Sequence, residues 1–69
     1  MSTIVKVIEV LATSEKSFDD AVRVAVQQAS ESVNNIKSVY VKEMKAEVKD
    51  NQVVSYGINA KISFEISRK

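Results

Sequence analysis

Four glutamates carry the side-chain chemistry that stands out first in this sequence. They are Glu9, Glu43, Glu47 and Glu65. A hard cation takes roughly six to eight oxygen ligands and could collect such carboxylates across a symmetry axis. No calcium-loop spacing surrounds these residues, so salt bridges with the ten lysines and arginines are the alternative role. The metal ligands, if any, therefore stay open at this point.

Catalytic chemistry has little support in the composition. The chain has neither cysteine nor histidine, which removes the common nucleophile–base pairs together with disulfides and the usual zinc sites. Gly57 is the only glycine, so no glycine-rich loop can cradle phosphates. We therefore predict that the protein is not an enzyme and has no catalytic residues.

The length and net charge of the chain narrow the range of expected binding partners. We interpret residues 1–69 as a single domain, and so short a chain without disulfides or structural zinc is expected to gain stability by oligomerisation. The net charge of +1 is too small for general attraction to nucleic acid. Neither a membrane-spanning apolar run nor a signal sequence is visible, so we expect a cytoplasmic protein without a membrane partner.

Three segments have the composition of strands. Residues 4–11 are β-branched and apolar on both parities, which is typical of a strand covered on two faces. Residues 37–48 change apolar parity, which indicates a bulge near Lys42 and Glu43. A hairpin loop is expected at 49–52, and residues 54–66 alternate strictly between apolar and polar side chains.

One helix is predicted between the first two strands. Ser17 is a suitable N-cap and Phe18 opens an apolar run spaced three and four residues apart. We expect the helix to end near Val33 to Asn35. Phe18 is expected to pack in the core beside residues of the third strand such as Ile62 or Phe64. The elements predict an α+β fold of β-α-β-β order in two layers.

The helix can cover only one face of the sheet, so the other face is free for subunits or a ligand. On residues 54–66 the free face carries Ser55, Gly57, Asn59 and Lys61. Lys61 could meet an anionic group, but an ion pair between subunits, with Glu65 or another carboxylate, is the expected role.

The spacing of several residues resembles that of the dodecins. The resemblance covers nearly the whole chain, with matching segments at 7–22, 33–36 and 55–66; Ala12 departs from it by replacing a common glycine. Its strongest block comprises Val7, Ile8, Glu9, Thr13, Ser14, Ser17, Phe18 and Ala21. The resemblance implies a three-stranded antiparallel sheet wrapped around one helix, with twelve copies closing into a hollow homo-oligomeric shell.

The resemblance also implies a ligand site that this chain has altered. Flavin-binding dodecins hold stacked flavin rings at two-fold axes, clamped by a tryptophan at the start of the second strand and hydrogen-bonded by a glutamine in the middle of the third. Ser38 and Gly57 occupy those positions here. Because stacking on an aromatic ring contributes roughly 1–3 kcal/mol, we expect weak flavin binding.

Three hypotheses for function follow from the resemblance. The first is a dodecin-like shell that binds, stores or sequesters a small ligand at subunit interfaces without the flavin clamp. In the second, Tyr40 replaces the lost aromatic face and the protein stores flavin, although Tyr40 could equally fill the vacated volume. The third is a calcium-binding or purely structural shell, since some relatives without the tryptophan are associated with calcium. The candidate ligand-binding residues are Ser38, Tyr40, Gly57 and Asn59.

Overall fold

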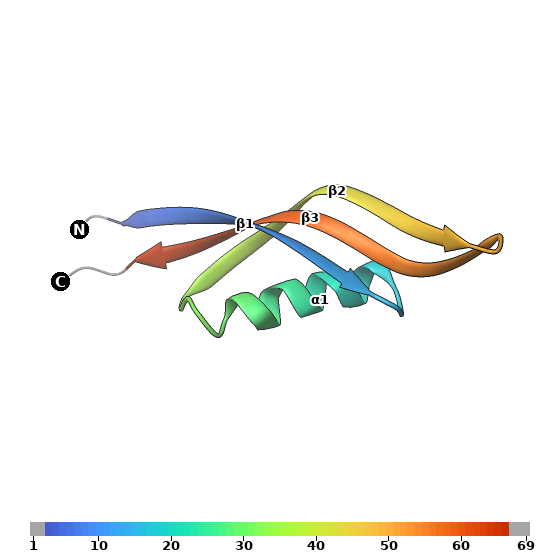
Figure 1. Cartoon of the computed structure of the whole chain (residues 1–69). Helices are drawn as coiled ribbons and strands as arrows, with labels where there is room; N and C mark the ends of the chain where they lie inside the picture. Colours follow the sequence, from blue (N-terminus) through green and yellow to red (C-terminus); the bar gives the residue numbers. More distant parts are fainter. Residues whose placement is uncertain (1–2, 67–69) are drawn as a thin grey trace.

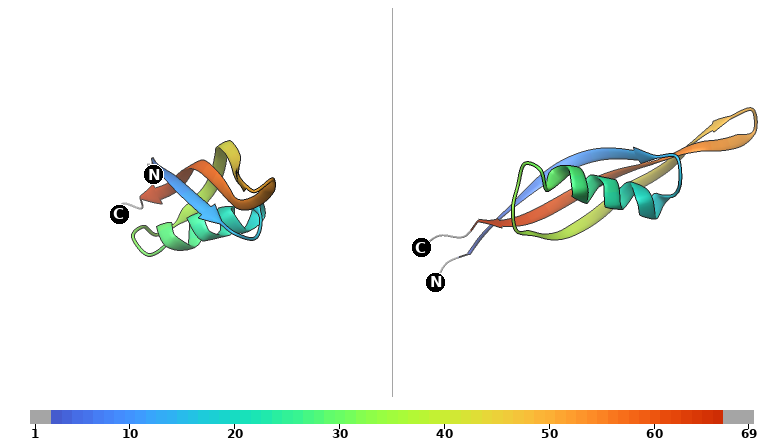
Figure 2. Two further views of the ribbon diagram at one scale, coloured as in Figure 1. Left: turned by 45° about the vertical axis from the view of Figure 1, so that its right-hand side comes forward. Right: turned by 90° about the horizontal axis from the view of Figure 1, so that it is seen from below.

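The computed structural model of the chain describes residues 3–66 as three strands and one helix (Figure 1). The elements are β1 (Ile4–Ser14), α1 (Phe18–Ala29), β2 (Ile36–Lys49) and β3 (Gln52–Ile66). Both neighbours of the central strand run antiparallel to it, in the order β1-β3-β2. The sheet curves over the helix, as Figure 2 shows from two further sides. The predicted α+β fold is therefore confirmed.

The core lies between α1 and the alternate residues of β3. Ile58, Ala60 and Ile62 on the strand are buried, and Ile62 is the largest side chain that is fully enclosed. The helix meets them with small side chains, Ala21, Ala25 and Ala29. Alanines let a helix approach a sheet closely, so this thin layer is filled by the isoleucines of the strand. Within residues 3–66 no helix is long and apolar enough to cross a membrane.

A bulge interrupts β2 where the change of apolar parity predicted it. Val41 lies opposite Ala60 and Glu43 opposite Asn59, so Lys42 is the extra residue on its strand. The bulge moves the inward-facing set from Val41 to Met44, which lies opposite the buried Ile58. A bulge also bends and twists its strand, which is consistent with the strong curvature of the sheet.

The helix begins at the predicted cap, reinforced by a buried serine. The backbone N–H of Asp20 donates to Ser17 Oγ at 2.9 Å. The hydroxyl of Ser14, only 8% exposed, donates to Asp20 Oδ2 at 2.7 Å and accepts from the N–H of Lys16 at 2.9 Å. The first turn of α1 is thereby tied to the end of β1.

Ser14→Ala is expected to lower the free energy of unfolding by about 1–2 kcal/mol, because it removes the acceptor of the Lys16 backbone N–H and the hydrogen bond to the Asp20 carboxylate. Urea denaturation followed by circular dichroism measures the effect. Ser30→Ala is the matched control, since its hydroxyl makes one exposed bond to the Gln27 carbonyl at 2.7 Å. Equal effects of the two substitutions would contradict this role for Ser14.

The prediction that the helix ends near Val33 to Asn35 is wrong, because α1 ends at Ala29. The apolar spacing continues to Val33, and this residue still packs on the core. The regular helical backbone, however, does not continue to Val33. Ser30 bonds its hydroxyl to the preceding turn, which competes with regular helix formation. The chain then forms turns over residues 30–32. Asn35 takes a left-handed conformation with φ of 61° before β2 begins.

Phe18 packs against the core and a residue of β3, as predicted, but the aromatic ring that it meets is Tyr56 rather than Phe64. The two rings meet edge to face, with centres 5.1 Å apart. The register explains this contact: Ser14 lies opposite Tyr56, and the helix begins four residues after Ser14. Phe18 is therefore half-buried at one end of the core.

Candidate functional site

The outer face of the sheet, defined here as the face turned away from α1, carries all four predicted ligand-binding residues. The odd-numbered residues of β3 from 55 to 65 occupy this face, because Ile58, Ala60 and Ile62 point to the helix. Gly57 and Asn59 belong to this set. Ser38 lies opposite Ser63 and Tyr40 opposite Lys61, so these two residues share the face.

One chain does not bring the four residues together. Ser38 is opposite a residue that lies six positions beyond Gly57 on β3. At about 3.3 Å per residue, this separation is roughly 20 Å. Tyr40 and Asn59 lie closer, because Tyr40 is opposite Lys61, which is two positions, or roughly 7 Å, from Asn59 on β3. Ser38 and Gly57 can touch the same small ligand only if a second copy of the chain supplies one of them.

Gly57 and Asn59 line an open groove of about 650 Å³ on the outer face. All three strands contribute side chains to it. The outer-facing residues are Leu11, Thr13, Glu43, Lys45, Glu47, Ser55, Gly57 and Asn59. Sequence reasoning missed Leu11, Thr13 and Lys45, although the strict alternation of β3 and its register with its neighbours would have placed them there.

Gly57 leaves part of the groove wall without a side chain. A Cβ atom at this position would meet the Lys45 carbonyl oxygen at 3.5 Å and Thr13 Cγ2 at 3.6 Å, which are ordinary contacts. Gly57 does not have a positive φ, so the backbone does not require glycine here. A Cβ atom therefore fits at this position, and the groove owes part of its width to the absence of a side chain.

Asn59 presents the groove with an unpaired polar atom. Its Oδ1 is buried and has no hydrogen-bond partner among residues 3–66. A buried acceptor without a donor costs about 1–3 kcal/mol. A donor from a ligand or from a second chain would remove this cost if the side chain turned to meet it, so Asn59 stays a candidate contact residue.

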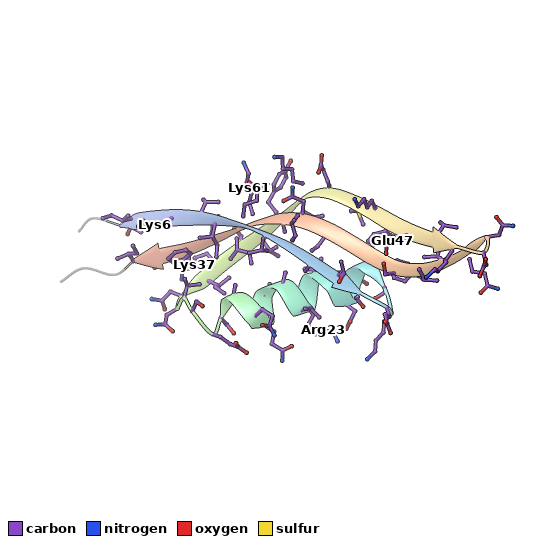
Figure 3. The ribbon with its side chains drawn as sticks, in the orientation of Figure 1. Lys6, Arg23, Lys37, Glu47 and Lys61 are labelled. Carbon is purple, nitrogen blue, oxygen red and sulfur yellow. The ribbon has the colours of Figure 1, made fainter. Side chains whose placement is uncertain are left out.

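Tyr40 does not fill a vacated volume within its own chain. Its side chain is 65% exposed, and it stands in a row across the sheet with Lys61 and Glu9. Lys61 projects from the outer face (Figure 3). The aromatic ring is thus free to meet a ligand or another subunit.

The four glutamates do not gather into a metal site within one chain. Glu9 Oε2 lies 3.6 Å from Lys42 Nζ, and Glu65 Oε1 lies 3.7 Å from Lys37 Nζ. Glu47 Oε1 accepts a hydrogen bond from the Ser55 hydroxyl at 3.1 Å. Within residues 3–66 no three acidic side chains come close enough together to hold a metal ion. The exposed ion pairs contribute little stability.

Comparison with known proteins shows the family. The family model of the dodecins matches residues 4–67. This chain belongs to the dodecin family. A curated relative, the calcium dodecin of Mycobacterium tuberculosis, is 33% identical over 64 residues, which are 93% of this chain and 90% of that protein.

Solved dodecins share the fold over almost their whole length. The dodecin from Streptomyces davaonensis superposes with a TM-score of 0.92 at 22% identity, covering 99% of this chain and 100% of that one. The dodecin from Streptomyces coelicolor gives 0.89 at 28% identity, covering 97% and 96%. The calcium dodecin of M. tuberculosis, described as calcium chelating, gives 0.79 at 32% identity, covering 96% and 94%.

Proposed function

We propose that this dodecin is a non-enzymatic, cytoplasmic, homo-oligomeric shell protein that holds a small ligand between its subunits without the flavin clamp. The separation of roughly 20 Å between Ser38 and Gly57 on the outer face is the observation that carries this proposal. A small-ligand site that uses both of these residues needs them from two chains. The unpaired Asn59 Oδ1 gives the ligand, or the adjoining subunit, a buried acceptor to meet.

The shape of the chain supports assembly. Its accessible surface is 5414 Å², whereas a compact protein of 7.7 kDa exposes about 4,300 Å². Its radius of gyration is 14.4 Å, against about 11 Å for a compact chain of this length. The excess surface, roughly 1,100 Å², exceeds the approximately 800 Å² that each partner buries in a standard interface.

Calcium is the second candidate ligand. The relative that is 33% identical over most of its length is a calcium dodecin. Glu43 and Glu47 both line the groove beside Asn59, so the groove offers carboxylate and amide oxygens of the kind that calcium prefers. A copy related by a two-fold axis would double their number.

Calcium and riboflavin titrations of the purified assembly distinguish these candidates. We expect a colourless protein with weak riboflavin binding, because neither Ser38 nor Gly57 can stack on or reach a flavin ring. A yellow protein with stoichiometric flavin that is lost in Tyr40→Ala would contradict the proposal and favour flavin storage.

If calcium is the ligand, Glu43→Gln with Glu47→Gln is expected to weaken calcium affinity at least about tenfold. Isothermal titration calorimetry measures the change. Glu31→Gln is the matched control, because Glu31 is an exposed carboxylate in the turn after α1 and outside the groove. Unchanged affinity in the double variant would place any calcium elsewhere.

A further inference from the structure

The bulge in β2 places two neighbouring charged residues on the outer face of the sheet. In a regular strand Lys42 and Glu43 would point to opposite faces. Because Lys42 is the extra residue of the bulge, Glu43 also points outward and lines the groove. Lys42 meets Glu9 of β1, which lies opposite the outer-facing Lys61. The bulge thus supplies the outer face with one more side chain than a regular strand would.

The ion pair between Lys42 and Glu9 crosses the central strand. Lys42 Nζ lies 3.6 Å from Glu9 Oε2, although β3 separates β2 from β1. Neighbouring strands lie about 4.8 Å apart, so the backbones of β2 and β1 are roughly 10 Å apart. Both side chains must therefore lie extended over the outer face of β3. We call this ion pair the strap.

The strap runs between two rows of outer-face residues, which are roughly 7 Å apart along the strands. The first row is Tyr40, Lys61 and Glu9, and the second is Glu43, Asn59 and Leu11. Lys42 leaves β2 between the rows and reaches the first row at Glu9. The groove respects this division, because all three residues of the second row line it and none of the three in the first row does.

We propose that the strap determines which ligands the groove admits, by separating the groove from the ring of Tyr40. The inference rests on the proposed ligand site and names the residues that set its length. With the strap closed, a ligand is confined to the groove beside Asn59. With the strap open, one flat ring can extend from the groove to the Tyr40 side chain, which is 65% exposed.

The strap is weak enough to open. The side chains of Lys42 and Glu9 are 46% and 48% exposed, and an exposed ion pair shifts an equilibrium by up to about fivefold. Lys61 lies opposite Glu9 and belongs to none of the ion pairs within residues 3–66. Lys61 therefore offers Glu9 a second cation when Lys42 moves away. A ligand that needs the open form loses apparent affinity in proportion to the closed fraction.

Riboflavin is a suitable probe of the open form, because it is flat and uncharged and salt therefore acts on the strap rather than on the ligand. Lys42→Met removes the charge, so we expect it to bind riboflavin about two- to fivefold more tightly than the wild-type assembly at low salt. High salt screens the ion pair and should raise the wild-type affinity towards that of the variant. Quenching of riboflavin fluorescence measures both effects.

Two further variants sharpen the riboflavin experiment. Lys37→Met is the matched control, because it breaks an ion pair of the same kind, with Glu65 at 3.7 Å, outside both rows. It should leave the affinity and its salt dependence unchanged. Adding Tyr40→Leu to Lys42→Met should abolish the gain. Equal affinity of the wild type and Lys42→Met, or no measurable binding by either, would overturn the strap as a barrier.

A second test needs no ligand. Lys42 must leave the ion pair before its amine reacts with acetic anhydride, and peptide mass spectrometry measures the rate for each lysine. In the native assembly we expect Lys42 to react about two- to fivefold faster in Glu9→Gln than in the wild type, with the rate at Lys37 unchanged. An unchanged rate at Lys42 would show that the strap is not closed in solution.

The outcomes separate the strap from the proposed function. Faster acetylation of Lys42 in Glu9→Gln, together with tighter riboflavin binding by Lys42→Met, would support the strap. An assembly that holds another small ligand, while both measurements stay unchanged, would overturn the strap and leave the ligand site standing. A wild-type monomer would overturn the proposed function, whereas the rate at Lys42 decides independently whether the strap closes.

Discussion

Ser38→Trp together with Gly57→Gln is expected to raise the affinity of this dodecin for riboflavin by roughly 10- to 100-fold. Stacking on an aromatic ring contributes about 1–3 kcal/mol, and each 1.4 kcal/mol is about a factor of ten in affinity. The structure has room for both changes. Ser38 is exposed on the outer face, and a Cβ at position 57 meets only ordinary contacts.

Quenching of riboflavin fluorescence on titration measures this gain. The single Ser38→Trp variant should recover more than Gly57→Gln, because stacking buries far more apolar surface than one hydrogen bond replaces. Ser30→Trp is the matched control, since Ser30 is an exposed serine at the end of α1. If the double variant keeps its assembly and gains no affinity, the groove differs from a flavin pocket at more than these two positions.

Ile62→Ala is expected to lower the free energy of unfolding by about 2–5 kcal/mol and to reduce assembly with it. Ile62 is the largest fully buried side chain, and small domains have only about 5–15 kcal/mol of stability in total. Its loss opens a cavity between β3 and the alanines of α1, which are too small to fill it.

Urea denaturation, followed by circular dichroism and size-exclusion chromatography, measures both effects of Ile62→Ala. Phe18→Ala is the informative comparison. Phe18 is half-buried against Tyr56 at the end of the core, so its truncation should cost less than that of Ile62. A larger loss for Phe18→Ala would mean that the stability of the fold depends on the helix start rather than on the centre of β3.

The sequence predicted those parts of the fold that local patterns determine. Strict alternation over residues 54–66 identified β3, and the parity change near Lys42 located the bulge that the register confirms. The end of the helix was missed because the apolar spacing continues to Val33, whereas the regular helix ends at Ala29. The partner of Phe18 was missed because it depends on how β1 leads into α1, a relation that no local pattern records.

The candidate site was less predictable because it depends on more than one chain. The alternation of β3 placed Gly57 and Asn59 on the free face, and the register adds Ser38 and Tyr40 to it. The distance between Ser38 and Gly57 follows from strand register, which a single strand pattern does not specify. The buried, unpaired Oδ1 of Asn59 emerges only from the packed structure.

Native mass spectrometry of the purified wild-type protein tests the central claim most directly. We predict one dominant homo-oligomer larger than a dimer; twelve copies of the 7.7 kDa chain would give about 92 kDa. Extra mass from a bound ligand or ion should disappear when the assembly is dissociated. A stable, folded monomer or dimer at micromolar concentration would contradict both the shell and the ligand site between its subunits.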